Sequence, residues 1–209
     1  YRNDIRLKWD EVIQSKNVFQ YEYEIITKNA TTKWVYERGV PILDQHGQVV
    51  ALEGIIIDLT RTKKLEKQLQ YFNDFNHKLK LPNRELLTKK IQSKLDNKTT
   101  NGTIFLVNFK DTQRLYRTHG YQYVELLTAS LVSKLKTLET PGLVLYYAEE
   151  DIYIYYSRHK MRLEEIKAFY QEISDAVFKT ITREQIRCSV GVSFLENNAT
   201  YAENVLLKA

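Results

Sequence analysis

The chain has very little cysteine and no long apolar run. Cys188 is the one cysteine among 209 residues, which excludes an internal disulfide framework and fits a reducing compartment. No apolar stretch approaches the roughly 20 residues of a membrane span. The charged start lacks Met and a signal peptide. We therefore expect a cytoplasmic part of a longer protein, whose other segments could include a membrane anchor.

Neither histidine nor charge of one sign is concentrated anywhere. The four histidines are scattered without the spacing of metal ligands, so we expect no zinc site. The net charge is +5, from 31 basic and 26 acidic residues. Because the basic residues mostly stand beside acidic ones, as in KKLEKQ, the pattern favours solvated helix faces over nucleic-acid binding.

The first 60 residues have the pattern of a small antiparallel sheet. Residues 4–16 have largely helical spacing, and residues 19–25 then alternate aromatic or aliphatic side chains with polar ones. Two further strands follow, one of them interrupted near residues 39–41 and the other ending near Leu59. One helix and three strands make a thin core, so we expect part of this domain to precede the chain.

Residues 61–80 change to helical periodicity. Leu65, Leu69 and Phe72 follow one apolar stripe, with Lys, Glu and Gln around them. The helix could pack on its own domain, or it could pair with its twin in a homodimer. We favour the dimer, since the helix joins two domains.

The remaining segment reads as a second α+β domain. A helix is predicted from residue 84, after Pro82 breaks the previous one, and strands and helices then follow in the order β-α-β-β-α-β. This order is typical of a split βαβ sheet of the ferredoxin-like or palm type, an α/β sandwich with a central sheet and flanking helices that we expect on one face of it.

Residues 146–156, YYAEEDIYIYY, predict a hairpin whose turn, 148–151, is acidic. Tight hairpin turns usually carry glycine, asparagine or aspartate-glycine because their favoured geometries need positive φ. This turn has no glycine. The pattern alone leaves three interpretations open: a metal site, a nucleotide site that has lost its function, or a solvated turn.

Residues 1–60 resemble the C-terminal half of a PAS domain with its PAC segment. The resemblance rests on the EYEI and KWVYERG strands, the DQHG turn and the closing Asp58-Leu59-Thr60. In that family the last of these motifs ends the final strand, and Asp58 and Thr60 would cap the outgoing helix and fix its exit angle. This resemblance implies a partial sensor domain, because residues 1–60 do not include the N-terminal half that holds most of the ligand cavity in that family.

Residues 81–209 resemble a GGDEF domain, the fold of diguanylate cyclases, which condense two GTP into cyclic di-GMP. LPNR at residues 81–84 matches the opening motif, and residues 188–192 match the final strand. Residues 206–209 match the start of the last helix, which implies that this helix is truncated. The implied organisation is a partial PAS domain (1–60), a connecting signalling helix (61–80) and the GGDEF-like domain (81–209).

The resemblance places the cyclase signature on the acidic turn, at Ala148, Glu149, Glu150, Asp151 and Ile152. Cyclases have two glycines there because a Cβ would intrude on the nucleotide phosphates. Glu149 adds bulk and negative charge where a triphosphate would lie. Glu150 and Asp151 keep carboxylates in the region of the catalytic and metal-binding acid, and they are the candidate metal ligands.

Other implied contacts of the family are altered as well. The metal-binding aspartate of the first strand aligns with Asn108, which offers a carbonyl oxygen without charge. The guanine-reading positions align with Tyr116 and Glu125. The product-inhibition motif is lost at Glu139 and Gly142. We therefore expect a vestigial nucleotide site without catalytic residues, with no cofactor, and with Mg²⁺ only where nucleotide binding survives.

These expectations predict a non-catalytic module of a bacterial cyclic di-GMP signalling protein. It would relay the state of the PAS domain to an output domain, for which the family arrangement implies an EAL phosphodiesterase. Three alternatives remain: a GTP-binding sensor without turnover, a cyclase with residual activity that uses Glu150 and Asp151, and a pure interaction scaffold.

Overall fold

The computed structural model describes residues 2–98, 101–181, 186–195 and 201–208. The chain forms two compact units, Tyr1–Tyr71 and Phe72–Ala209. The division falls inside helix α2, Thr60–Asp74. Throughout the described ranges, no helix combines the length and apolar character that crossing a bilayer would demand.

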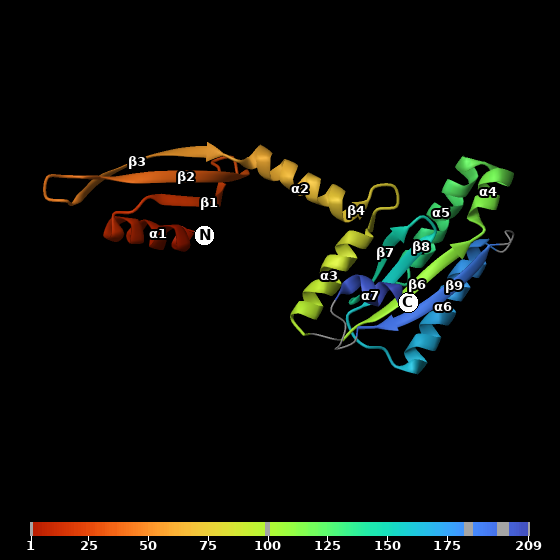
Figure 1. Cartoon of the computed structure of the whole chain (residues 1–209). Coiled ribbons are helices and arrows are strands. Elements are labelled where there is room, and N and C mark those ends of the chain that lie inside the picture. The colour runs from red at the N-terminus through yellow and green to blue at the C-terminus, as the bar shows by residue number, and fades with distance from the viewer. Residues whose placement is uncertain (1, 99–100, 182–185, 196–200, 209) are drawn as a thin grey trace. The chain divides into compact units, whose positions relative to one another are not determined.

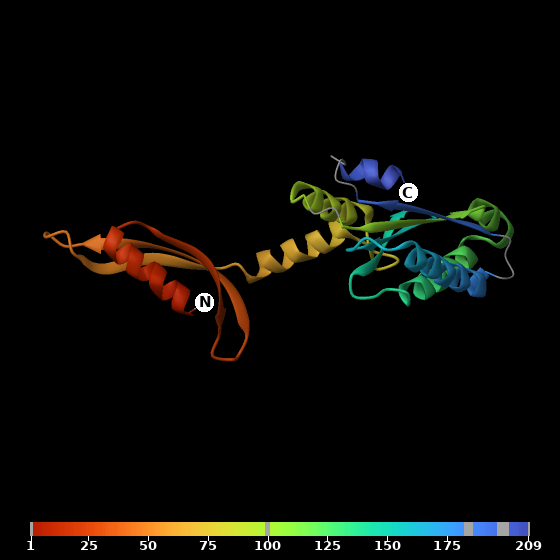
Figure 2. The same cartoon turned by 90° about the horizontal axis from the view of Figure 1, so that it is seen from below.

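In the N-terminal unit one helix lies against an antiparallel sheet of three strands in the order β1-β2-β3 (Figures 1 and 2). Trp9 stacks on Phe19 with ring centroids 4.1 Å apart. Gly39 leaves room for this stack, because a Cβ there would lie 3.0 Å from the Trp9 ring. The elements are α1 Arg2–Ser15, β1 Phe19–Ile26, β2 Thr32–Leu43 and β3 Val49–Asp58.

The predicted interruption of the second strand is wrong. β2 continues through residues 39–41, and Pro41 pairs with Leu52 of β3. β1 reaches only as far as Gly39 along β2, so Pro41 has a neighbouring strand on one side only. Proline is tolerated at such edge positions, where its missing N–H leaves no ladder bond unmade.

The helix predicted over 61–80 ends earlier than expected. α2 stops at Asp74, and β4 (Phe75–Asn76) then pairs with β5 (Leu81–Pro82). The side chain of Asn76 accepts the Leu79 N–H at 2.9 Å, which offers the backbone an alternative to the helix. Leu81 is fully buried, and this burial draws the segment into the second unit.

The second unit has a four-stranded antiparallel sheet in the order β7-β8-β6-β9. The predicted β-α-β-β-α-β order is confirmed. The sequence analysis did not predict α4, which Gly120, at φ +80°, separates from the next helix. The elements are α3 Arg84–Asp96, β6 Thr103–Lys110, α4 Thr112–His119, α5 Tyr121–Lys136, β7 Leu143–Glu149, β8 Ile152–Ser157, α6 Leu163–Ile181, β9 Arg187–Phe194 and α7 Ala202–Leu207.

Helices cover both faces of this sheet, so the predicted α+β sandwich is confirmed, whereas the expectation that the helices lie on one face is wrong. One core joins the sheet to α5 and α6, with Phe105 edge-on to Phe169 at 4.9 Å. The other core joins it to α3 and α7 through residues such as Ile91 and Val205. β6 contributes to both cores, because its successive side chains point to opposite faces.

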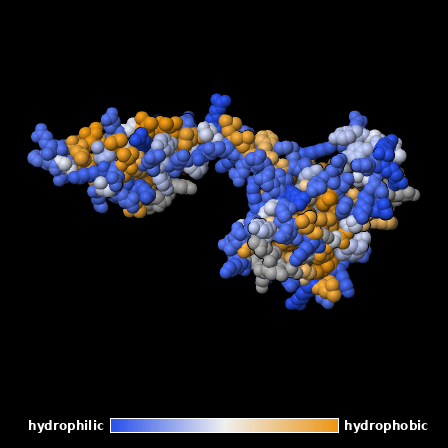
Figure 3. All heavy atoms as spheres, viewed as in Figure 1, coloured by the Kyte–Doolittle hydropathy of each residue, from blue (hydrophilic) through white to orange (hydrophobic). Residues whose placement is uncertain are grey.

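Apolar side chains also remain exposed in the N-terminal unit, where Figure 3 shows them as orange atoms. β3 lies at the edge of its sheet and is exposed along almost its whole length. A row of large aliphatic residues on an edge strand is a typical interaction surface. Its exposed members are Val50, Leu52, Ile55, Ile56 and Ile57.

We predict that Phe105→Ala lowers the free energy of unfolding by about 3–5 kcal/mol, because it leaves a cavity in the core between the sheet and α5 and α6. Phe178→Ala is the matched control, since Phe178 is 68% exposed. It should change the free energy by no more than about 0.5 kcal/mol. Chemical denaturation followed by circular dichroism measures both, and equal losses would contradict this placement of the core.

Candidate functional site

The acidic signature forms a tighter turn than the sequence predicts. β7 continues through Glu149, which pairs with Ile152, so the turn comprises Glu150 and Asp151 rather than residues 148–151. The register shifts between Tyr147 and Glu149, which leaves Ala148 as an irregularity in the strand. Asp151 has φ +68°, a left-handed conformation that aspartate tolerates better than most residues. Asp151 therefore adopts the positive φ that glycine often provides in such a turn.

Asp151 is fixed from two sides. Its carbonyl oxygen accepts the Phe109 N–H at 2.9 Å, and its carboxylate accepts a hydrogen bond from the hydroxyl of Thr112. Partial burial raises the pKa of Asp151; the Thr112 hydrogen bond opposes this rise, and the charge of Glu150 adds to it. This carboxylate thus binds a side chain of its own domain.

Glu149 turns toward Arg84, which the sequence analysis did not single out. The Arg84 guanidinium donates to Glu149 at 2.7 Å and to Glu203 of α7 at 2.6 Å. Asn83 begins α3 by capping it, since its side chain accepts the Leu86 N–H at 3.0 Å. The opening LPNR motif therefore supplies both the helix cap and the cation that neutralises Glu149.

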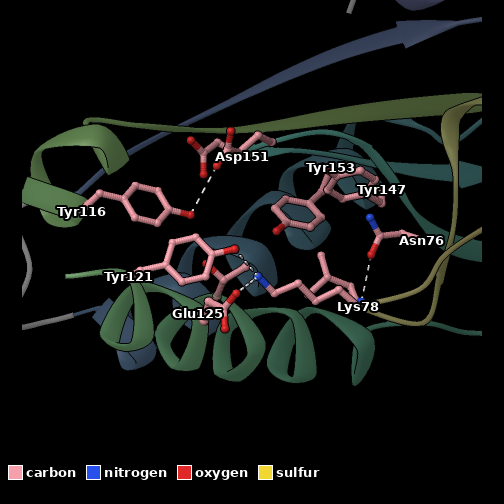
Figure 4. A pocket seen from close by; sticks show the side chains of 11 residues that line it. Asn76, Lys78, Tyr116, Tyr121, Glu125, Tyr147, Asp151 and Tyr153 are labelled. Carbon is pink, nitrogen blue, oxygen red and sulfur yellow. Dashed lines mark hydrogen bonds and ion pairs between the residues drawn. The ribbon is translucent and has the colours of Figure 1, made fainter. Parts of the chain in front are cut away.

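A cavity of about 160 Å³ lies beside the turn, as Figure 4 shows. The rings of Tyr147 and Tyr153 contact each other edge-on at 6.1 Å on one side of it. Tyr121 of α5 faces them from the other side. Its lining residues are Asn76, Lys78, Leu79, Tyr116, Tyr121, Glu125, Thr128, Tyr147, Glu150, Asp151 and Tyr153.

Most polar groups of this cavity bind one another. The Lys78 ammonium forms an ion pair with Glu125 and lies 3.4 Å from the Tyr121 hydroxyl. This contact raises the pKa of Lys78 and lowers that of Glu125. The Tyr116 hydroxyl donates to Glu150 at 3.3 Å, and burial followed by the charge of Glu150 raises the pKa of Tyr116.

Four of the predicted site residues therefore meet in one cavity: Tyr116, Glu125, Glu150 and Asp151. Asn108 is not among the described lining residues. It lies on β6 opposite Ile152. The sequence analysis missed Lys78, which lies 47 residues from its partner Glu125.

Two carboxylates, Glu150 and Asp151, are the candidate donors for a magnesium ion at this cavity. Mg²⁺ near phosphates is normally held by carboxylates in octahedral geometry. In the described parts of the chain, no three His, Cys, Asp or Glu side chains gather closely enough to hold a metal. Glu150 and Asp151 already accept hydrogen bonds from Tyr116 and Thr112.

A second predicted set, the relay residues, lies where β3 ends and α2 begins. Asp58 accepts the Thr60 N–H at 2.9 Å and forms an ion pair with Lys33 at 2.7 Å. The Thr60 hydroxyl accepts the Trp34 N–H at 3.1 Å. These contacts, chiefly the hydrogen bond from Lys33, hold the pKa of Asp58 well below its usual range. The start of α2 is thus tied to β2.

The apolar stripe of α2 is exposed. Leu65 is 49% exposed, Leu69 62% and Phe72 55%. Phe72 contacts the ring of His77, with centroids 4.5 Å apart. Each of these side chains therefore offers a large part of its apolar surface to a further contact.

Comparison with known proteins identifies a family at the N-terminus. Residues 1–56 match the family model described as the PAS fold. No protein of curated function matches the chain significantly in sequence.

Solved structures of GGDEF proteins share the fold. One is the diguanylate cyclase SiaD from Pseudomonas aeruginosa in complex with its activator SiaC. It is 13% identical with a TM-score of 0.59, and the match covers 71% of this chain and 60% of that chain. Another is the coiled coil and GGDEF domain of DgcB from Caulobacter crescentus in complex with c-di-GMP, 10% identical with a TM-score of 0.60 over 71% of this chain and 83% of that one.

A third is the S helix-GGDEF-EAL protein LapD from Vibrio cholerae, bound to c-di-GMP. It is 18% identical with a TM-score of 0.58, covering 70% of this chain and 35% of that one. The matched part thus spans less than two thirds of SiaD and of LapD. Identities this low establish the fold and leave function to the site. The chain joins a PAS-type N-terminal segment to a unit with the GGDEF fold.

We predict that Asp151→Asn stabilises the protein near pH 7. A raised pKa means that the folded state binds this proton more readily than the unfolded state, so stability falls as pH rises through the interval between the two pKa values. Asparagine removes this loss and still tolerates a left-handed conformation. The gain over wild type should shrink as pH falls toward the ordinary aspartate value of about 3.9.

Denaturation midpoints between pH 3 and pH 8 test this. Asp175→Asn on α6 is the control, because Asp175 is exposed to solvent. A gain for Asp151→Asn that grows toward acid pH would show that the carboxylate stabilises the turn instead.

Proposed function

We propose that this chain is a non-catalytic sensory and regulatory module of cyclic di-GMP signalling. The PAS-type unit receives a state, α2 transmits it, and the GGDEF-fold unit passes it to an output domain of the EAL class. The combination of GGDEF and EAL in LapD, whose GGDEF part shares this fold, supports that choice of output domain. The single exposed cysteine fits a cytoplasmic setting.

The observation that carries the non-catalytic assignment is the pairing of polar groups inside the cavity. Lys78 binds Glu125, and Tyr116 binds Glu150. A nucleotide would have to replace these bonds before it gained any of its own, and each broken bond leaves a desolvated partner. Self-pairing of this kind stabilises the ligand-free state.

The size and charge of the cavity support the same conclusion. Pockets for drug-sized ligands usually measure about 300–1,000 Å³, whereas this one measures about 160 Å³. Glu150 and Asp151 line the cavity, and Glu149 directly precedes them in the chain. Of these three acids, Glu149 alone forms an ion pair with a described residue, Arg84. An incoming triphosphate would meet uncompensated negative charge from the other two.

The proposed relay runs through paired copies of α2. Its exposed apolar stripe has the spacing of helix packing. Two structural neighbours carry a further helical element beside the GGDEF domain, a coiled coil in DgcB and an S helix in LapD. A homodimer through Leu65, Leu69 and Phe72 would bury this stripe. Asp58 and Thr60 then connect the pairing of the helices to the sheet of the PAS-type unit.

We predict that the protein forms no cyclic di-GMP from GTP and Mg²⁺. Chromatography of the reaction mixture after prolonged incubation measures the product, with an active diguanylate cyclase as the positive control. Calorimetry with GTP and Mg²⁺ should show no binding in the micromolar range, because the cavity polar groups are paired. Product formation would establish a cyclase, and binding without product would establish a GTP sensor; either result contradicts the proposal.

We predict that Leu69→Asp converts a dimer into a monomer, because it places a charge in the apolar contact between helices. Gln70→Asp adds the same charge to the neighbouring exposed position and should leave the dimer intact, since Gln70 lies off the stripe. Sedimentation equilibrium measures the association. Equal dissociation constants for wild type and Leu69→Asp would rule out this interface.

A further inference from the structure

A second hollow, of about 360 Å³, lies beside α3 and the end of β8. It shares no described lining residue with the signature cavity. Four of its residues, Lys89, Lys90, Ser93 and Lys94, come from α3, and two more, Tyr156 and Arg158, come from β8 and the residue just after it. None of the described lining residues is acidic.

Two of these cations have their charge uncompensated in the contacts that the structure shows. The Lys90 ammonium donates to the Tyr146 hydroxyl at 3.1 Å. The Lys94 ammonium donates to the carbonyl oxygens of Arg158, at 3.3 Å, and Asn101, at 3.5 Å. Hydroxyl and carbonyl oxygens satisfy the donors without neutralising them. Lys89 differs, because it forms ion pairs with Glu85 at 2.9 Å and Asp74 at 3.5 Å.

Tyr156, one of the residues that line the hollow, carries an unpaired polar atom. Tyr156 is 4% exposed, and its hydroxyl is a buried side-chain oxygen for which the structure provides no hydrogen-bond partner. Buried hydroxyls nearly always have a partner, so this one requires an explanation. The Lys94 ammonium stands 5.9 Å from the centre of the same ring. Burial raises the pKa of Tyr156 to about 12, and Arg158 opposes this rise, so the hydroxyl keeps its proton as a donor.

We propose that this hollow binds a small phosphate-bearing anion, held by Lys90, Lys94 and Arg158 above the ring of Tyr156. The ammonium groups, which now lie along the tyrosine rings, turn toward the anion on flexible stems. A phosphate oxygen then becomes the acceptor that the Tyr156 hydroxyl lacks. The volume lies within the range of small-molecule pockets.

The compact anion is favoured over an acidic segment of a protein. The three cations Lys90, Lys94 and Arg158 and the residue with the unpaired hydroxyl, Tyr156, line the same hollow. Several oxygens on one phosphorus atom match such a set of donors. The site is independent of the proposed function, since it requires neither the signature cavity nor a dimer.

An anion bound in this hollow would affect the end of α2 through Lys89. Lys89 lines the hollow and also holds Asp74, the last residue of α2. A bound anion competes with Asp74 for the Lys89 ammonium, because both are negatively charged. The same ligand therefore loosens one contact at the end of that helix.

Calorimetry of the full chain with inorganic pyrophosphate tests the site. We expect saturable binding at low salt that weakens as salt rises, because the contacts are ionic. Lys94→Gln and Arg158→Gln should each weaken binding by about tenfold, the effect of losing one hydrogen bond to a charged group. Lys167→Gln, which removes an exposed lysine of α6, is the charge-matched control and should leave the affinity unchanged.

Tyr156→Phe separates this site from unspecific attraction of anions. The substitution keeps the ring and removes only the unpaired hydroxyl, so the fold should be at least as stable as in wild type. Its pyrophosphate affinity should nevertheless fall about tenfold. GDP distinguishes a nucleotide from free phosphate: tighter binding than pyrophosphate, abolished by Lys94→Gln, identifies a nucleotide ligand of the same site.

Three results would overturn the proposal. The first is no heat with pyrophosphate at low salt. The second is an affinity that falls equally in Lys94→Gln and Lys167→Gln, or that stays unchanged in Tyr156→Phe. The third is a glutamate-rich peptide that binds where pyrophosphate does not, which would make the hollow a docking site for an acidic protein segment.

Discussion

The burial of strand β6 on both faces is the constraint on which the second unit depends. β6 pairs with β8 on one side and with β9 on the other, and its side chains enter both cores. Such a strand has to be almost continuously apolar, as TIFLVNF is. The position of the hairpin follows from this pairing, because Asn108 lies opposite Ile152, directly after the acidic turn. The pairing of β6 thus fixes the position of the acidic turn through the core of the sheet.

The polar contacts around the acidic turn have different physical requirements from the packing of the sheet. Packing requires only apolar side chains of suitable size, whereas phosphate binding requires a bare backbone and uncompensated cations. In this chain the nearby cations, Lys78 and Arg84, are committed to Glu125, Glu149 and Glu203. The same fold can therefore surround a site whose polar groups bind one another, and the fold alone is a weak guide to activity.

Sequence patterns predicted the parts of the structure that depend on local periodicity. The order of strands and helices in the second unit and the hairpin around Tyr146 and Tyr153 belong to this class. Long-range polar contacts escaped prediction, because nothing near Arg84 in the sequence indicates a partner 65 residues away at Glu149. The end of α2 was not predicted for another reason. The Asn76 side chain accepts a backbone N–H that a continuing helix would use, and the burial of Leu81 outweighs the apolar periodicity that extends past Asp74 in the sequence.

These contacts give α3 a central position in any relay through the second unit. At its start, the Asn83 N–H donates to the carbonyl oxygen of Asp74, the last residue of α2, at 2.9 Å, and Arg84 joins the signature turn to Glu203 of α7. One turn later Lys89 holds Asp74 again. In the proposed relay, α3 is therefore the element that would connect a displacement of α2 to the signature turn and to the last described helix. Such a relay would require no ligand in the signature cavity, because the contacts that form it are internal to the protein.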